Sequence, residues 1–156
     1  MNRILRNIDE AEKRTNIVGH ILYVTYPLLK DKKLLTKAII EAKEIIIACI
    51  NAILQNEYIN KRIGIEKDSS QNFRVFREKC AGNYGINERE VQKMIELFEL
   101  AEKHKESSME FMKDNKVVIL NDRMKVNMLT LEKTKDMIDL AKEVLIKTKS
   151  GILRKI

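Results

Sequence analysis

One uninterrupted apolar helical stretch constrains the fold of this chain more than any other feature. Residues 32–62 contain no proline or glycine, and their apolar side chains recur with the 3.6-residue period of an α-helix. One stripe contains Leu35, Ala38, Ile39, Ala42, Ile46, Cys49 and Ile53, and the opposite side carries Ile40, Ile47, Ile50 and Leu54. A helix that is apolar on nearly all sides needs neighbours in several directions. We therefore expect it at the centre of a helical bundle, capped by Asp31 at its start and by Gly64 at its end.

The composition fits a single all-α domain spanning residues 1–156. Hydrophobic residues make up 44% of the 156-residue chain, which is enough for a core at the usual size of one domain. One proline and five glycines are too few for a disordered, collagen-like or turn-rich all-β chain. Tryptophan is absent from the sequence, so the core must consist mainly of aliphatic side chains.

Local signals place further helices around the central one. The apolar period predicts a first helix over residues 2–26, which Pro27 ends. Asp68 is a suitable N-cap for a short third helix reaching Cys80. Asn87 and Glu90 form a capping box at the start of a fourth helix, with one more helical turn expected through residues 107–112.

A change of period marks a β-hairpin over about residues 116–128, between the fourth and the last helix. Residues 116–120 and 123–128 flank Asn121-Asp122, which predicts a two-residue turn. In that register one face contains Val117, Ile119, Met124, Val126 and Met128, and the other contains Val118, Leu120, Arg123 and Lys125. The second face is either a contact surface or is covered by the C-terminal tail. A last helix follows from Thr130 to Ser150-Gly151, so the predicted fold is a four- to five-helix bundle with a two-stranded β-hairpin.

Several classes of protein lack support in the sequence. The longest apolar run, residues 45–54, is too short to span a bilayer, and the N-terminal residues do not resemble a signal peptide. Cys49 and Cys80 alone do not form a disulfide framework, which favours a reducing, cytoplasmic compartment. The histidine and cysteine spacing matches no zinc or di-iron motif, and no phosphate-binding or dinucleotide motif is present. We therefore expect no metal and no cofactor.

The positive charge is concentrated toward the C-terminus. Lys and Arg outnumber Asp and Glu by 30 to 23 overall, and by ten to six over residues 114–156. Such asymmetry can steer a protein toward phosphates or an acidic partner, although lysine-rich composition alone gives the same charge. The residues expected to bind are Val118, Leu120, Arg123 and Lys125 in the hairpin, and Lys147, Lys149, Arg154 and Lys155 in the last segment.

The first helix carries the only residues that we select as catalytic candidates. Arg6, Asp9, Lys13, Asn16, His20 and Tyr23 share one face, where His20 could act as a general base and Lys13 could stabilise an anion. The same stripe is equally the pattern of a solvated helix face. Arg14 and His20, separated by five residues, resemble the arginine–histidine motif of the HEPN ribonucleases. That resemblance implies a small helical, metal-independent ribonuclease.

The sequence as a whole favours a function without catalysis. We expect a cytoplasmic helical interaction or assembly module that binds a protein partner or a second copy of itself, with weak nucleic-acid binding as a secondary expectation. The alternative is the HEPN-like ribonuclease, with His20 and Arg14 at its active site. The two hypotheses differ in geometry, because the enzyme needs His20 in a concave site with an arginine within reach.

Overall fold

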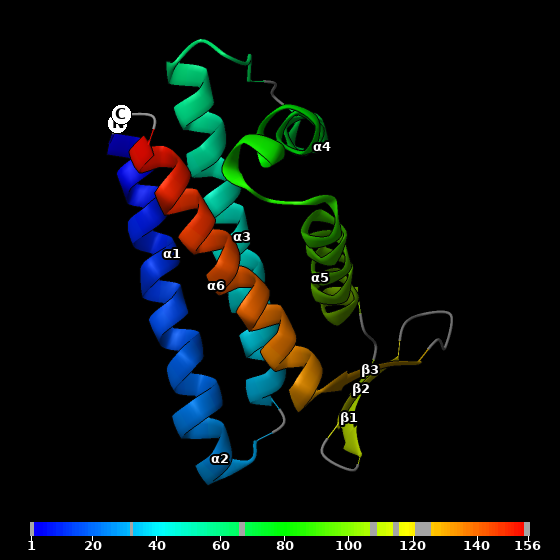
Figure 1. Ribbon diagram of the computed structural model, residues 1–156. Coiled ribbons are helices and arrows are strands. Elements are labelled where there is room, and N and C mark those ends of the chain that lie inside the picture. Colours follow the sequence, from blue (N-terminus) through cyan, green and yellow to red (C-terminus); the bar gives the residue numbers. More distant parts are fainter. Residues whose placement is uncertain are drawn as a thin grey trace.

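A computed structural model describes residues 2–31, 33–65, 68–106, 109–113, 116–120 and 126–154 (Figure 1). The chain is an all-α helical bundle with a small β-sheet before its last helix. The helical elements are α1 (Asn2–His20), the π-helical turn η1 (Ile21–Thr25), α2 (Tyr26–Leu29), α3 (Lys33–Ile59), α4 (Ser69–Val75), the π-helical turn η2 (Phe76–Cys80), the 3₁₀ turn η3 (Ala81–Tyr84), α5 (Glu88–Glu106) and α6 (Leu131–Arg154). The strands are β1 (Met109–Lys113), β2 (Lys116–Leu120) and β3 (Val126–Thr130).

Helix α3 occupies the centre of the bundle, as its apolar sequence predicts. It packs against α1, α5, α6 and η2, and Ile45, Ile46 and Ile53 are fully buried in it. Helix α1 runs antiparallel to α3 and α6, so that α1 begins and α6 ends at the same end of the bundle (Figure 1). The side chains of Cys49 and Cys80 are both buried and both are free thiols. Burial raises the pKa of Cys49 to about 12.

The predicted helix starts are confirmed by their hydrogen bonds. The backbone N–H of Lys33 donates to the Asp31 carboxylate at 3.0 Å. At α5 the Glu90 N–H donates to Asn87 Oδ1 at 2.8 Å, and the Asn87 N–H donates to Glu90 Oε1 at 3.1 Å, which completes the capping box. Thr130 Oγ1 accepts from the Lys133 N–H at 2.9 Å and begins α6. These caps use contacts within four residues, which explains why the sequence alone identifies them.

The first helix continues through Pro27, contrary to the prediction that it ends there. Tyr26, directly before the proline, keeps helical angles of φ −62° and ψ −45°, and its N–H donates to the carbonyl of Ile21, five residues back. A proline inside a regular α-helix clashes with the carbonyl four residues earlier. The π-helical turn changes the backbone spacing immediately before Pro27, and the helix ends only at Lys30, which has φ 50°.

The end of α3 is formed by Lys61, not by the predicted Gly64. Lys61 has φ 60°, the Arg62 N–H donates to the Glu57 carbonyl at 2.9 Å, and the Lys61 N–H donates to the Tyr58 carbonyl at 2.9 Å. These bonds form a Schellman motif, which usually places glycine at the left-handed position. Arg62 also forms an ion pair with the buried Glu57 side chain, so the cap is held by a side chain as well as by the backbone.

Helix α6 likewise passes the position at which the sequence predicted its end. Gly151 lies inside the helix, and it is buried against the ring of Tyr84. A Cβ atom at this position would lie 2.3 Å from Tyr84 Cδ2. The glycine is therefore required for close packing and is not a helix terminator.

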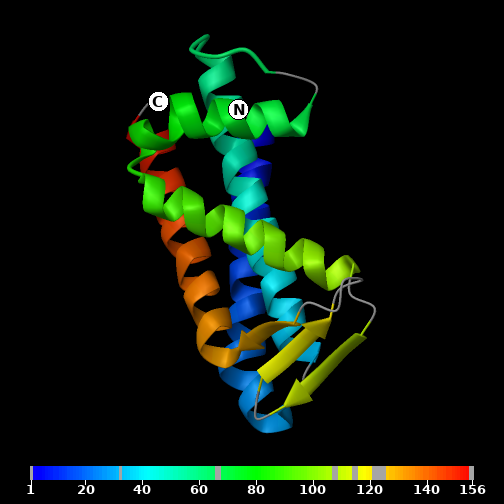
Figure 2. The ribbon, with the colours of Figure 1, turned by 90° about the vertical axis from the view of Figure 1, so that its right-hand side faces the viewer.

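The β region differs from the predicted hairpin in its strand number and its register. Residues 109–113, which were expected to include a helical turn, form β1 and pair with β2, so that β2 is the central strand of an antiparallel β1-β2-β3 sheet (Figure 2). Leu120 pairs with Val126 and Val118 pairs with Met128. The predicted register is therefore wrong, because a two-residue turn would place residue 123 opposite Leu120, whereas Leu120 pairs with Val126. The predicted turn and Met124 lie outside the described residues.

Candidate functional site

The polar stripe predicted on the first helix lies on its exposed face. All six of its residues, Arg6, Asp9, Lys13, Asn16, His20 and Tyr23, are exposed. The ring atom Nδ1 of His20 lies 3.1 Å from the hydroxyl of Thr25, one helical turn further along. Lys13 and His20 thus lie on the solvent-exposed face of α1.

Arg14 is engaged in ion pairs that join two helices. Its Nη1 lies 2.8 Å from Glu41 Oε2 of α3, and its Nε lies 2.7 Å from Glu10 Oε1 of α1. The hydrogen bond to Glu41 is the main cause that raises the pKa of Arg14. The structure thus gives Arg14 two carboxylate partners, whereas His20 contacts Thr25.

Tyr23 is the member of the predicted stripe that meets another helix. The residue is 50% exposed, and two ammonium groups of α6 lie over its ring, Lys142 at 5.3 Å and Lys135 at 5.6 Å from the ring centroid. Contacts of this kind are cation–π interactions. Within the described residues, neither lysine has an ion pair with a carboxylate.

A cavity of about 320 Å³ opens beside this contact. Its wall is mainly apolar and aromatic, and it also carries two lysines; the lining residues are Leu22, Tyr23, Tyr26, Pro27, Lys30, Leu131 and Lys135. Neither Lys135 nor Lys142 is among the binding residues predicted from the sequence. Their seven-residue spacing, which continues to Lys149, is a signal that both lie on one helix face.

Two lysines that the sequence predicted as binding residues form ion pairs between helices. Lys147 Nζ lies 2.7 Å from Glu90 of α5, and Lys149 Nζ lies 2.5 Å from Glu12 of α1. Arg154 is exposed, and its Nε lies 3.4 Å from the carbonyl of Ser150. Of the other predicted binding residues, Val118 and Leu120 are in the central strand β2, whereas Arg123, Lys125 and Lys155 lie outside the described residues.

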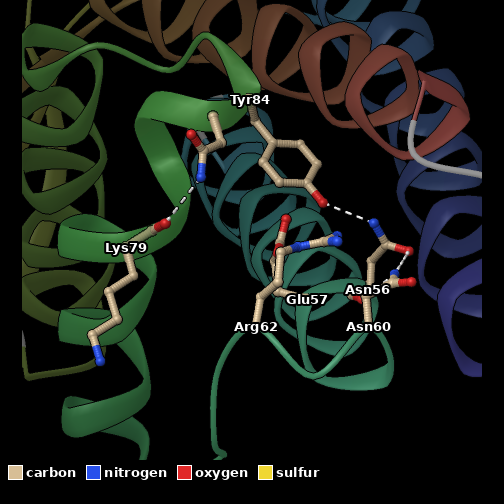
Figure 3. A network of polar contacts seen from close by, with 7 residues as sticks. Asn56, Glu57, Asn60, Arg62, Lys79 and Tyr84 are labelled. Carbon is tan, nitrogen blue, oxygen red and sulfur yellow. Dashed lines mark hydrogen bonds and ion pairs between the residues drawn. The ribbon is translucent and has the colours of Figure 1, made fainter.

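A buried polar network joins the end of α3 to η3 (Figure 3). The side-chain amide of Asn56 donates to the Tyr84 hydroxyl at 2.9 Å, and Asn60 donates to the Asn56 carbonyl at 2.7 Å. Burial is the main cause that raises the pKa of Tyr84 to about 12, and the neighbouring Glu57 carboxylate adds to the rise. This network satisfies its polar groups internally, which is the pattern of a structural contact.

An apolar groove of about 490 Å³ lies where α3, α4 and α5 meet. Ile47, Ile50, Leu54, Phe73 and Phe98 form its apolar wall, and Lys43, Asn51, Ser69, Ser70 and Asn72 complete the lining. The Phe73 and Phe98 rings pack edge to face with centroids 5.7 Å apart. Asn51 is an exposed residue of this groove.

Comparison with known proteins found no matching family model, curated protein or solved structure. Among the described helices, none is long and apolar enough to cross a membrane. A search of the same residues found no group of three or more His, Cys, Asp and Glu side chains arranged to hold a metal ion.

Proposed function

We propose that the protein is a non-catalytic helical interaction module that binds an amphipathic helix of a partner protein in the groove between α3, α4 and α5. The observation that supports this proposal is the apolar wall of the groove, where the partly buried rings of Phe73 and Phe98 lie beside Ile47. Apolar grooves formed by helices bind partner helices whose apolar side chains recur at i, i+3, i+4 and i+7.

The charge of the groove defines the chemistry of the partner. Among the described residues of its lining, Lys43 alone is charged, and the remaining polar residues there are amides and hydroxyls. The chain as a whole carries a formal charge of +7. A helix with an apolar face and acidic flanks complements both features, whereas a basic helix would be repelled.

The environments of the catalytic candidates also favour binding over catalysis. Arg14 is held by two carboxylates, and His20 is on an exposed helix face. An acid–base site needs its groups within hydrogen-bond reach of the same reacting atom. The groove, in which Lys43 is the one ionisable residue among those described, supports recognition instead.

Site-specific crosslinking tests the proposal. A photo-crosslinking amino acid replaces Asn51 in the groove, and a matched protein carries it at Lys13 on the outer face of α1. In cells of the native host, the Asn51 position should give an adduct with one other protein, and Ile47→Asp, at a partly exposed residue of the groove, should abolish it. A peptide from the crosslinked partner should then bind the unmodified chain and lose affinity for I47D.

Three results would contradict this function. An adduct of two identical chains would identify the groove as a self-association surface. The same adducts at Asn51 and Lys13 would show that the groove has no selective partner. A crosslinked segment with a basic flank would contradict the charge argument.

A further inference from the structure

The geometry points to a second binding site, for a nucleotide unit, where Tyr23 of η1 meets Lys135 and Lys142 of α6. A nucleotide unit combines a flat base with a phosphate, and it occurs both as a free nucleotide and in a single strand. The site lies on the α1–α6 side of the bundle and involves none of the residues that line the groove between α3, α4 and α5.

Two positively charged groups of α6 lie over the Tyr23 ring. Lys142 and Lys135 place two ammonium groups within 5.3 and 5.6 Å of one ring centroid, so like charges are brought together without a carboxylate partner among the described residues. Asp139 lies one helical turn from each lysine, but it lines a cavity beside α5 and forms an ion pair with neither lysine within the described residues. An anion bound beside Tyr23 would relieve the repulsion between the two lysines.

Lys149, the next lysine of the row on α6, differs from Lys135 and Lys142 because it has a carboxylate partner. Lys149 continues the same seven-residue row on α6, and Glu12 of α1 neutralises it at 2.5 Å. At Tyr23 the side chain facing α6 is an aromatic ring instead. At one end of this row Lys149 thus has a carboxylate partner within the protein. At the other end Lys135 and Lys142 are available to bind an external anion.

The cavity beside Tyr23 has the size and the lining of a small-ligand site. Its volume of about 320 Å³ is in the range of small-ligand sites. Leu22, Tyr26 and Leu131 provide apolar walls, and Lys30 adds a third cation to the lining. Aromatic faces for base stacking, combined with lysines for phosphates, are the features by which proteins bind single strands without reading their sequence.

The backbone that lines the cavity is irregular at two places. Tyr23 lies within the π-helical turn η1, and such turns are frequent at functional sites. Lys30 has left-handed angles of φ 50° and ψ 31°, which are uncommon for a residue other than glycine. Both irregularities occur within the segment that lines the cavity.

Binding measurements on the full chain test this inference. The probes are a fluorescent thymidine oligomer of about 15 nucleotides, AMP and inorganic phosphate, each measured at about 50 mM salt. The oligomer should bind, and Lys142→Gln should weaken it and reduce the slope of log affinity against log salt by about one. Tyr23→Leu should weaken binding about fivefold or more, whereas Tyr23→Phe should retain it, because the base stacks on the ring.

The matched control is Lys37→Gln, which removes the same charge from an exposed position on α3. If AMP displaces the bound oligomer, the ligand is the nucleotide unit itself. If the oligomer binds and AMP does not displace it, the ligand is the single strand. The inference is overturned if neither the oligomer nor AMP binds, or if K37Q weakens oligomer binding as much as K142Q does. It is also overturned if inorganic phosphate displaces the oligomer as effectively as AMP does. Loss of binding in K142Q with Y23L unaffected would overturn the role of the ring.

Discussion

Two tyrosines at opposite ends of α6 lie in contrasting environments. Tyr84 is buried, its hydroxyl accepts a hydrogen bond from the Asn56 amide, and its ring packs against Gly151. We call Tyr84, Asn56, Gly151 and Glu57 the closed end. Tyr23 is half-exposed beneath two lysines without carboxylate partners in the described chain; Tyr23, Lys135 and Lys142 form the open end. Buried polar groups with internal partners stabilise a fold, whereas exposed charges without partners contribute little to it. The difference separates a region built for stability from one available for binding.

The largest expected effect comes from adding one methyl group at the closed end. Gly151→Ala would place a Cβ atom 2.3 Å from Tyr84 Cδ2, so the ring or α6 must move. Overpacking of this kind costs about 1–3 kcal/mol of unfolding free energy. Urea denaturation measures this loss.

Gly19 provides the matched control for that substitution. It is also a helical glycine, on α1, and a Cβ atom there would meet no atom within 4 Å. Gly19→Ala should raise the unfolding free energy by about 0.5–1 kcal/mol through helix propensity alone. If both alanine variants are stabilised, Tyr84 does not depend on close contact with Gly151.

The second prediction exchanges each tyrosine for phenylalanine. Tyr84→Phe removes the acceptor of the Asn56 amide in a buried site and should cost about 1–3 kcal/mol of unfolding free energy. Tyr23→Phe removes a hydroxyl from an exposed ring and should change it by less than about 0.5 kcal/mol. If thermal denaturation shows equal losses of unfolding free energy for the two variants, Tyr84 and Tyr23 do not differ in their contribution to stability.

The third prediction concerns stability at alkaline pH. The folded chain raises the pKa of Cys49 from 9.0 to about 12 and that of Tyr84 from 10.0 to about 12. The folded state therefore binds these protons more tightly than the unfolded state does. Their contribution to stability is complete below about pH 9 and is lost as the pH rises toward 12.

A pH series of denaturation curves measures this loss. Cys49→Ala removes the thiol, so the decline in that variant should begin closer to pH 10, where the Tyr84 contribution begins to fall. A stability that is constant from pH 9 to 12 in the unmodified chain would contradict the burial of both groups.

The sequence predicts the features that depend on neighbours along the chain. The caps at Asp31, Asn87 and Thr130 use hydrogen bonds within four residues, and the apolar period alone places α3 at the centre. The position of β1 was missed because it depends on pairing with β2. Gly151 was interpreted as a helix end because its close contact with Tyr84 comes from a distant element.

The same distinction explains the functional candidates. The period of α1 places Tyr23 on a polar face, but only the packing of α1 beside α6 brings Lys135 and Lys142 to its ring. Charge counting selected Lys147 and Lys149 instead, and a count cannot show that Glu90 and Glu12 lie opposite them. A site assembled from two helices requires knowledge of which helix faces meet.

The most direct test of the contrast between the two ends is the thermal unfolding of Lys142→Gln with and without the thymidine oligomer. A ligand that binds only the folded state raises the unfolding temperature. We predict that the oligomer raises it for the unmodified chain and raises it much less for K142Q, and that the two proteins unfold at the same temperature without oligomer. A lower unfolding temperature for ligand-free K142Q, with an undiminished shift on adding oligomer, would show that the open end stabilises the fold and does not bind nucleotides.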